Sequence, residues 1–194
     1  GYIETSPRVG VEGFKDGKKT DFLENEQLAR LGETLKLAEA EGLPWRQNHG
    51  MKAKHRAKPE NAREPINPHA IAAIRLLLLT GCRLREILHL RWQDVSFERA
   101  TLHLPDSKTG ARDIYLSAPA LEILAQIPRI EGCPYVIAGA QLDKPRADLK
   151  RPWARITAHA GLEGLRLHDL RHSYASVGAA SGMGLLFVGK LLGH

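Results

Sequence analysis

The chain has 194 residues and a net charge of +6 at neutral pH, with 43% hydrophobic and 26% charged residues. This length suits one domain with a short extension, and the composition is that of an ordinary globular protein. No stretch approaches the ~18 consecutive apolar residues of a membrane span, and the N-terminus lacks the pattern of a signal peptide. We therefore expect no membrane partner, and the basic charge favours a polyanion, most commonly nucleic acid.

The chain contains only two cysteines, Cys82 and Cys133. Two thiols make neither a disulfide framework nor a four-ligand zinc site, so the sequence indicates a protein of the reducing cytoplasm.

The N-terminal part predicts helices joined by a long connection. Residues 1–21 are rich in glycine and charge, and indicate a linker from an upstream domain. Leucines at helical spacing predict an amphipathic helix over residues 24–41. Residues 42–66 form a polar connection with a basic run over residues 52–58, typical of a functional or disordered segment. A helix is then expected from Asn67-Pro68, which suit a cap and a first position, to a left-handed stop at Gly81.

Short elements and three more helices complete the expected fold. A second short helix covers residues 84–90, and β-like runs follow at residues 94–97, 101–104 and 112–116. Pro119 opens a helix to Gln126, and residues 135–138 are a further candidate strand. Helices are expected over residues 146–160, 168–180 and 184–192. The predicted fold class is thus mainly α with one small antiparallel β-sheet (α+β).

Four short segments carry candidate chemistry. The first contains Arg83, which follows a glycine stop between two helices, and Glu86 three residues later, which can orient it. Taken alone, this pair is better explained as a common surface ion pair at a helix start. The second contains Lys108 in the turn between two strands, and an ordinary solvated turn lysine has the same appearance.

The third segment is His168-Asp169-Leu170-Arg171-His172. His168 and Arg171 share a helical face, and a titratable ring beside a planar guanidinium suits a phosphate. His168 and His172 also have the spacing of metal ligands on a helix, but the sequence offers no evident third ligand, so we expect no metal. The fourth segment ends in Gly193 and His194, and alone indicates only a helix that stops at glycine.

Together the four segments resemble the catalytic domain of the tyrosine recombinases, the phage integrase family. The shared features are Thr-Gly-x-Arg-x-x-Glu, a lysine in a β-hairpin, His-x-x-Arg and Leu-Gly-His, in this order, over nearly the whole chain from residue 22 to residue 194. The resemblance implies a DNA strand-transferase that needs no cofactor and binds duplex DNA as a homotetramer. It further implies a bacterial or phage-derived origin and action on chromosomal DNA.

The resemblance also assigns roles to residues. It implies two phosphate-binding arginines, Arg83 and Arg171, and a hairpin lysine, Lys108. It implies two active-site histidines, His168 and His194, with Glu86 as a supporting acid.

The family's nucleophile is a tyrosine that forms a covalent 3′-phosphotyrosine with DNA. In the family this tyrosine follows the Leu-Gly-His motif, whereas the four tyrosines here are Tyr2, Tyr115, Tyr135 and Tyr174. We therefore expect residues 22–194 to be a catalytic domain truncated before its nucleophile and inactive as it stands. Two alternatives are an inactive DNA-binding module derived from the family and an enzyme similar to type IB topoisomerases.

Overall fold

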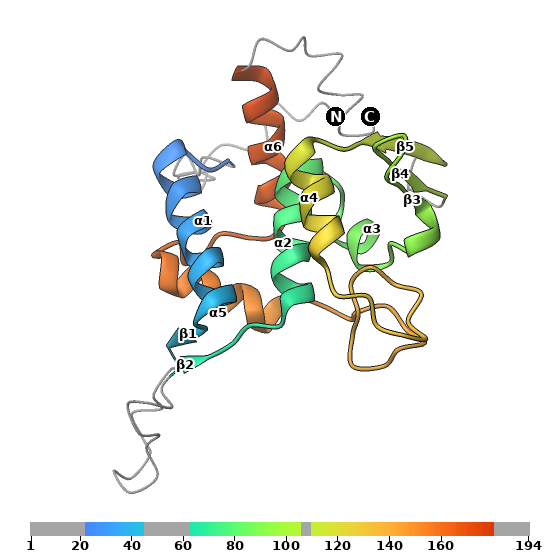
Figure 1. The fold of residues 1–194 in the computed structure, drawn as a ribbon. Helices are drawn as coiled ribbons and strands as arrows, with labels where there is room; N and C mark the ends of the chain where they lie inside the picture. The colour runs from blue at the N-terminus through green and yellow to red at the C-terminus, as the bar shows by residue number, and fades with distance from the viewer. Residues whose placement is uncertain (1–21, 45–62, 106–109, 181–194) are drawn as a thin grey trace, which may run out of the picture.

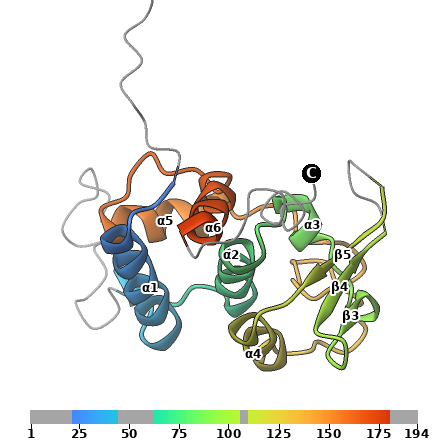
Figure 2. The ribbon, with the colours of Figure 1, turned by 90° about the horizontal axis from the view of Figure 1, so that it is seen from above.

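A computed structural model describes residues 22–44, 63–105 and 110–180, with side chains up to residue 176. Helix α2 (Pro68–Thr80) lies at the centre and packs against α1, α3, α4 and α6 (Figure 1). Viewed from above, α1, α5 and α6 lie on one side of α2, and α4 and the larger sheet lie on the other (Figure 2). The mainly α fold with a small antiparallel sheet, which the sequence predicts, is confirmed.

Local sequence signals explain where the central helix begins and ends. The side chain of Asn67 accepts a hydrogen bond from the backbone N–H of Ala70 at 3.3 Å, and Pro68 occupies the first turn. The helix ends where Gly81 adopts a left-handed backbone with φ of 62°, which glycine adopts without a Cβ penalty. Both ends match the sequence-based prediction, and the second end sets the position of the residues that follow.

Helix α1 (Asn25–Ala40) leads into a pair of two-residue strands. These strands, β1 (Leu43–Pro44) and β2 (Arg63–Glu64), pair antiparallel and flank residues 45–62, which include the basic run and lie outside the described residues. The guanidinium of Arg155 fastens the pair to α5 (Lys150–Ala160), since it donates to the carbonyl oxygens of Leu43 at 3.1 Å and Glu64 at 3.0 Å.

The larger sheet has three antiparallel strands in the order β3-β4-β5. They are β3 (Val95–Ser96), β4 (Thr101–Leu104) and β5 (Arg112–Tyr115), and they follow α3 (Leu84–Leu88) and the short 3-10 helix η3 (Trp92–Asp94). Leu102 pairs with Ile114, and both are buried on the face that meets the helices. Helix α4 (Ala118–Gln126) then returns to pack on α2.

Two expected elements differ in the structure. Residues 135–138 form isolated bridges, Arg91 with Tyr135 and Ala138 with Pro145, rather than a strand. The segment is instead held by the buried ring of His69, whose Nδ1 lies 3.0 Å from the carbonyl oxygen of Val136. Helix α5 begins at residue 150 rather than 146, because the side chain of Asp148 accepts from the N–H of Lys150 at 2.9 Å and starts the helix there.

The last described helix is α6 (Asp169–Ala180), while the helix expected over residues 184–192 lies outside the described residues. One continuous core joins the helices and the larger sheet, and its largest fully buried side chains include Ile71, Ile74, Leu76, Leu102 and Ile156. Among the helices described, none is long and apolar enough to cross a membrane.

Candidate active site

The turn after α2 places Arg83 and Glu86 in contact. Glu86 Oε2 accepts the backbone N–H of Arg83 at 2.7 Å, and Oε1 accepts its Nη1 at 2.9 Å. The Glu86 carboxylate thereby caps the start of α3, since it satisfies the backbone N–H of Arg83, the residue that precedes the helix. The carboxylate is nearly buried, with 7% of the Glu86 side chain exposed, whereas 29% of the Arg83 side chain remains exposed. Arg83 is therefore held by Glu86 at both its backbone N–H and its Nη1, while part of its side chain stays exposed.

A third side chain joins this pair from the sheet. Arg112 of β5 donates from Nη2 to Glu86 Oε2 at 2.9 Å, and only 13% of its side chain is exposed. The sequence analysis did not single out Arg112. A signal was present, because Arg112 lies two residues before the buried Ile114 and alternation along a strand puts both on the core-facing side. A basic residue in that register requires a buried anionic partner.

Helix α6 brings Arg171 to the same place. Arg171 is 7% exposed and donates from Nη1 to the carbonyl oxygen of Gly81, the residue that ends α2. Burial lowers the pKa of Arg171, and the nearby guanidinium groups of Arg83 and Arg112 lower it further, while Glu86 acts in the opposite direction. Arg83 and Arg171, expected to surround one phosphate, therefore lie together although distant in sequence.

His168 lies one turn before Arg171 and is exposed. Its pKa is lowered, first by desolvation of the ring and then by the positive neighbours, including Arg171 and Arg166, while Asp169 raises it. The rings of His168 and His172 meet edge to face with centroids 4.9 Å apart. His168 therefore favours its neutral form near pH 7.

A second carboxylate, that of Asp169, holds the turn that contains His168. Asp169, at the start of α6, accepts the backbone N–H of Arg166 at 2.8 Å and its Nη2 at 2.7 Å. This carboxylate is buried, with 4% of the side chain exposed, and it fixes the turn from which His168 projects. Asp169 thus has a structural role, because it holds the turn that leads into α6.

The remaining candidates are placed as follows. Lys108 and His194 lie outside the described residues. Tyr174 on α6 is partly buried, and burial raises its pKa, which disfavours a phenolate there. Within the described ranges, no group of three or more His, Cys, Asp or Glu side chains is arranged to hold a metal ion.

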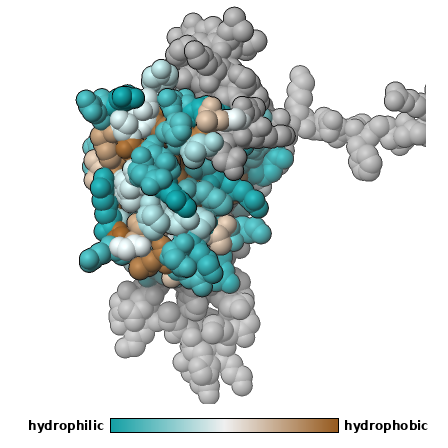
Figure 3. Space-filling view, turned by 90° about the vertical axis from the view of Figure 1, so that its right-hand side faces the viewer, coloured by the Kyte–Doolittle hydropathy of each residue, from teal (hydrophilic) through white to brown (hydrophobic). Residues whose placement is uncertain are grey.

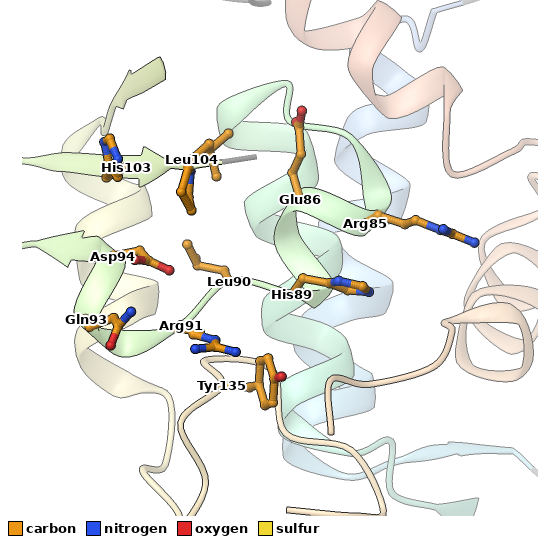
Figure 4. A pocket seen from close by; sticks show the side chains of 11 residues that line it. Arg85, Glu86, His89, Leu90, Arg91, Gln93, Asp94, His103, Leu104 and Tyr135 are labelled. Carbon is orange, nitrogen blue, oxygen red and sulfur yellow. The ribbon is translucent and has the colours of Figure 1, made fainter. Parts of the chain in front are cut away.

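A cavity of about 480 Å³ adjoins the cluster at Glu86 (Figure 4). Its lining includes Glu86, Arg85, His89 and Arg91, and Arg91 lies over the ring of Tyr135 at 5.5 Å. The guanidinium groups of the cluster do not line it, so we treat the cavity as a neighbour of the site rather than the site itself.

The face that carries the larger sheet is mainly hydrophilic, with hydrophobic residues scattered over it (Figure 3). Among the described residues the large exposed apolar side chains are few, and they are Phe22, Phe97, Tyr115, Ile130 and Leu142. Such a surface suits a charged partner better than an apolar one.

Solved structures share this fold. The catalytic core of lambda integrase has a TM-score of 0.57 with 22% identity, and the likeness covers 86% of this chain and 92% of that one. The XerH site-specific recombinase bound to its difH substrate has a TM-score of 0.63 with 24% identity, over 90% of this chain and 47% of that one. The fold is therefore that of the tyrosine recombinase catalytic domains.

The family model described as "Phage integrase family" matches residues 53–194, and the chain belongs to that family. A shufflon-specific DNA recombinase from Escherichia coli is 34% identical over 102 residues, which are 52% of this chain and 25% of the relative. The chain spans well under half the length of such curated relatives.

Proposed function

We propose that the natural protein is a site-specific DNA recombinase, or integrase, that cuts and rejoins duplex DNA through a covalent 3′-phosphotyrosine. The observation that carries this proposal is the convergence of Arg83 and Arg171 at the end of α2, next to His168. Family membership supports the reaction class, and the solved XerH complex holds a member of the same fold on its DNA substrate.

The arginine cluster suits the charge that develops during phosphodiester transfer. Negative charge builds on the two non-bridging oxygens as the pentavalent transition state forms. Planar guanidinium groups match those oxygens and remain protonated, so Arg83 and Arg171 would bind the phosphate and stabilise the transition state. Glu86 fixes Arg83 and balances part of the positive charge when no DNA is bound.

Proton transfer requires further groups. His168, whose lowered pKa favours a neutral ring, can accept a proton from the attacking hydroxyl. The resemblance assigns Lys108 as the acid that protonates the leaving 5′ oxygen, and His194 as the second histidine. These two assignments rest on the sequence motifs.

The nucleophile is the part of the reaction that these residues do not supply. Tyr174 is held in α6 with a raised pKa, so it is poorly suited to attack. We propose that the 194-residue polypeptide forms no covalent adduct by itself. We further propose that the active assembly is a homotetramer on DNA in the cytoplasm.

The test begins by finding the DNA sequence. The full-length natural protein is incubated with a library of duplexes that carry a randomised segment, and complexes that survive denaturation are isolated and sequenced. A nicked duplex of the recovered sequence should then give a denaturation-resistant protein–DNA band. Binding without any band would favour an inactive DNA-binding module, and relaxation of supercoiled plasmid without sequence preference would favour a type IB topoisomerase.

Two controls sharpen the result. Arg171→Gln should abolish the band, because the guanidinium stabilises the transition state, and circular dichroism must show that the variant is folded. The 194-residue polypeptide should give no band. An adduct formed by it would show that the nucleophile is misassigned, and Tyr174 would be the first residue to replace.

A further inference from the structure

Arg112 is a buried charge that the proposed reaction does not use. Its side chain is 13% exposed and contacts Glu86, which is itself 7% exposed. The Nη2 of Arg112 donates to Glu86, so Arg112 can influence the reaction through this carboxylate.

The contact pattern at Glu86 shows how such an effect arises. Oε2 accepts both the backbone N–H of Arg83 and Nη2 of Arg112, while Oε1 accepts Nη1 of Arg83. Arg112 thus holds the oxygen that also anchors the Arg83 backbone. Without Arg112 the carboxylate could turn about its side-chain bonds, and the Arg83 guanidinium would turn with it.

Charge balance points in the same direction. Two guanidinium groups, those of Arg83 and Arg112, bond to the carboxylate of Glu86, and the Arg171 guanidinium lies near enough to feel its charge, so the cluster keeps a net positive charge. Arg112 offsets the charge of Glu86 within the covered part of the site. The more exposed Arg83 is thereby left free to attract an anion, because its partner carboxylate is already shared.

We propose that Arg112 is a positioning residue, which through Glu86 fixes the Arg83 guanidinium in the orientation that receives a phosphate oxygen. The inference rests on the proposed function, since it names a further residue for the same site. It also connects β5 to the arginine pair at the end of α2.

The test uses the 194-residue chain and inorganic phosphate as the probe. Nuclear magnetic resonance follows the Nε–H signals of Arg83 and Arg171, first for side-chain order and then during a phosphate titration. In Arg112→Gln we expect the Arg83 signal to lose order and the phosphate affinity to fall about 10-fold or more, the scale of a misplaced binding group. Arg75→Gln removes an ion pair of similar length but greater exposure between α2 and α1, at 2.8 Å from Glu39, and should change neither measurement.

Stability is measured separately by urea denaturation, because a merely structural role would lower stability without moving these two signals. Arg112→Lys keeps the charge but not the planar group, and we expect an intermediate loss of Arg83 order. If Arg112→Gln does not fold, the lysine variant decides alone. An Arg83 signal and a phosphate affinity that match the unaltered chain in a folded variant overturn the inference. If phosphate shifts no arginine signal in the unaltered chain, the phosphate site and the proposed function both fail.

Discussion

Replacing Glu86 with glutamine should destabilise the domain strongly, because it removes the nearly buried carboxylate that bonds to both Arg83 and Arg112. The carboxylate accepts three hydrogen bonds of 2.7 to 2.9 Å, and two of them come from charged donors. Bonds to charged groups contribute about 1.5–3 kcal/mol each, and removing one partner of a buried ion pair costs about 3–5 kcal/mol. Because Arg83 is partly exposed, water weakens its ion pair with Glu86. We therefore expect a loss of about 3 kcal/mol in the free energy of unfolding.

Urea denaturation followed by circular dichroism measures this loss by linear extrapolation. The matched control is Glu41→Gln. Glu41 pairs with Arg63 at 2.7 Å, but the side chains are 61% and 46% exposed, so water screens the pair and the loss should stay below about 1 kcal/mol. Similar small losses for the two variants would refute the argument that burial makes the Glu86 cluster strong.

Three further predictions follow from single features. Gly42→Ala should destabilise the domain by more than Gly132→Ala in the same urea assay. Both glycines have positive φ, which costs about 1–2 kcal/mol for alanine, but only at Gly42 would the new Cβ lie 2.7 Å from the backbone of β2. His168 should titrate by nuclear magnetic resonance below its ordinary pKa of about 6.5, and Asp169→Asn should lower that pKa further. Because the folded state disfavours its protonation, His168 contributes stability that is present above the ordinary pKa and lost as the pH falls. Finally, duplex DNA should bind the chain with an affinity that falls as salt rises, and Arg85→Ala, at an exposed position on α3, should reduce the salt slope by about 1. An affinity independent of salt would contradict an interface dominated by phosphates.

The sequence predicts best those features whose cause is local. Asn67 and Gly81 mark the ends of α2 because a cap and a left-handed stop each depend on one residue and its immediate neighbours. The predicted start of α5 was wrong by four residues. An apolar pattern does not show that the Asp148 side chain accepts the N–H of Lys150, where the helix begins. Residues 135–138 are apolar and buried, and the apolar run is why they were predicted to form a strand. Their backbone instead contacts the ring of His69 on α2.

In the candidate site, too, residues in local motifs were predicted and a residue that depends on a distant partner was not. The ordered motifs identified Arg83, Glu86 and Arg171 by resemblance, and the structure brings these three together. Arg112 was missed because its role depends on Glu86, which lies 26 residues earlier on a different element. Only the tertiary fold shows that a core-facing basic residue on β5 has an acid opposite it.

The bond from Arg171 to the carbonyl oxygen of Gly81 spans 90 residues of chain. On the ribosome, a nascent chain that has reached Glu86 therefore carries one arginine of the pair and its acid, but not the second arginine. Affinity for a polyanion should rise only when α6 emerges and packs on α2. A growing chain would thus be less prone to associate with nucleic acid before its core is complete, and a bound polyanion would afterwards stabilise the finished domain by mass action.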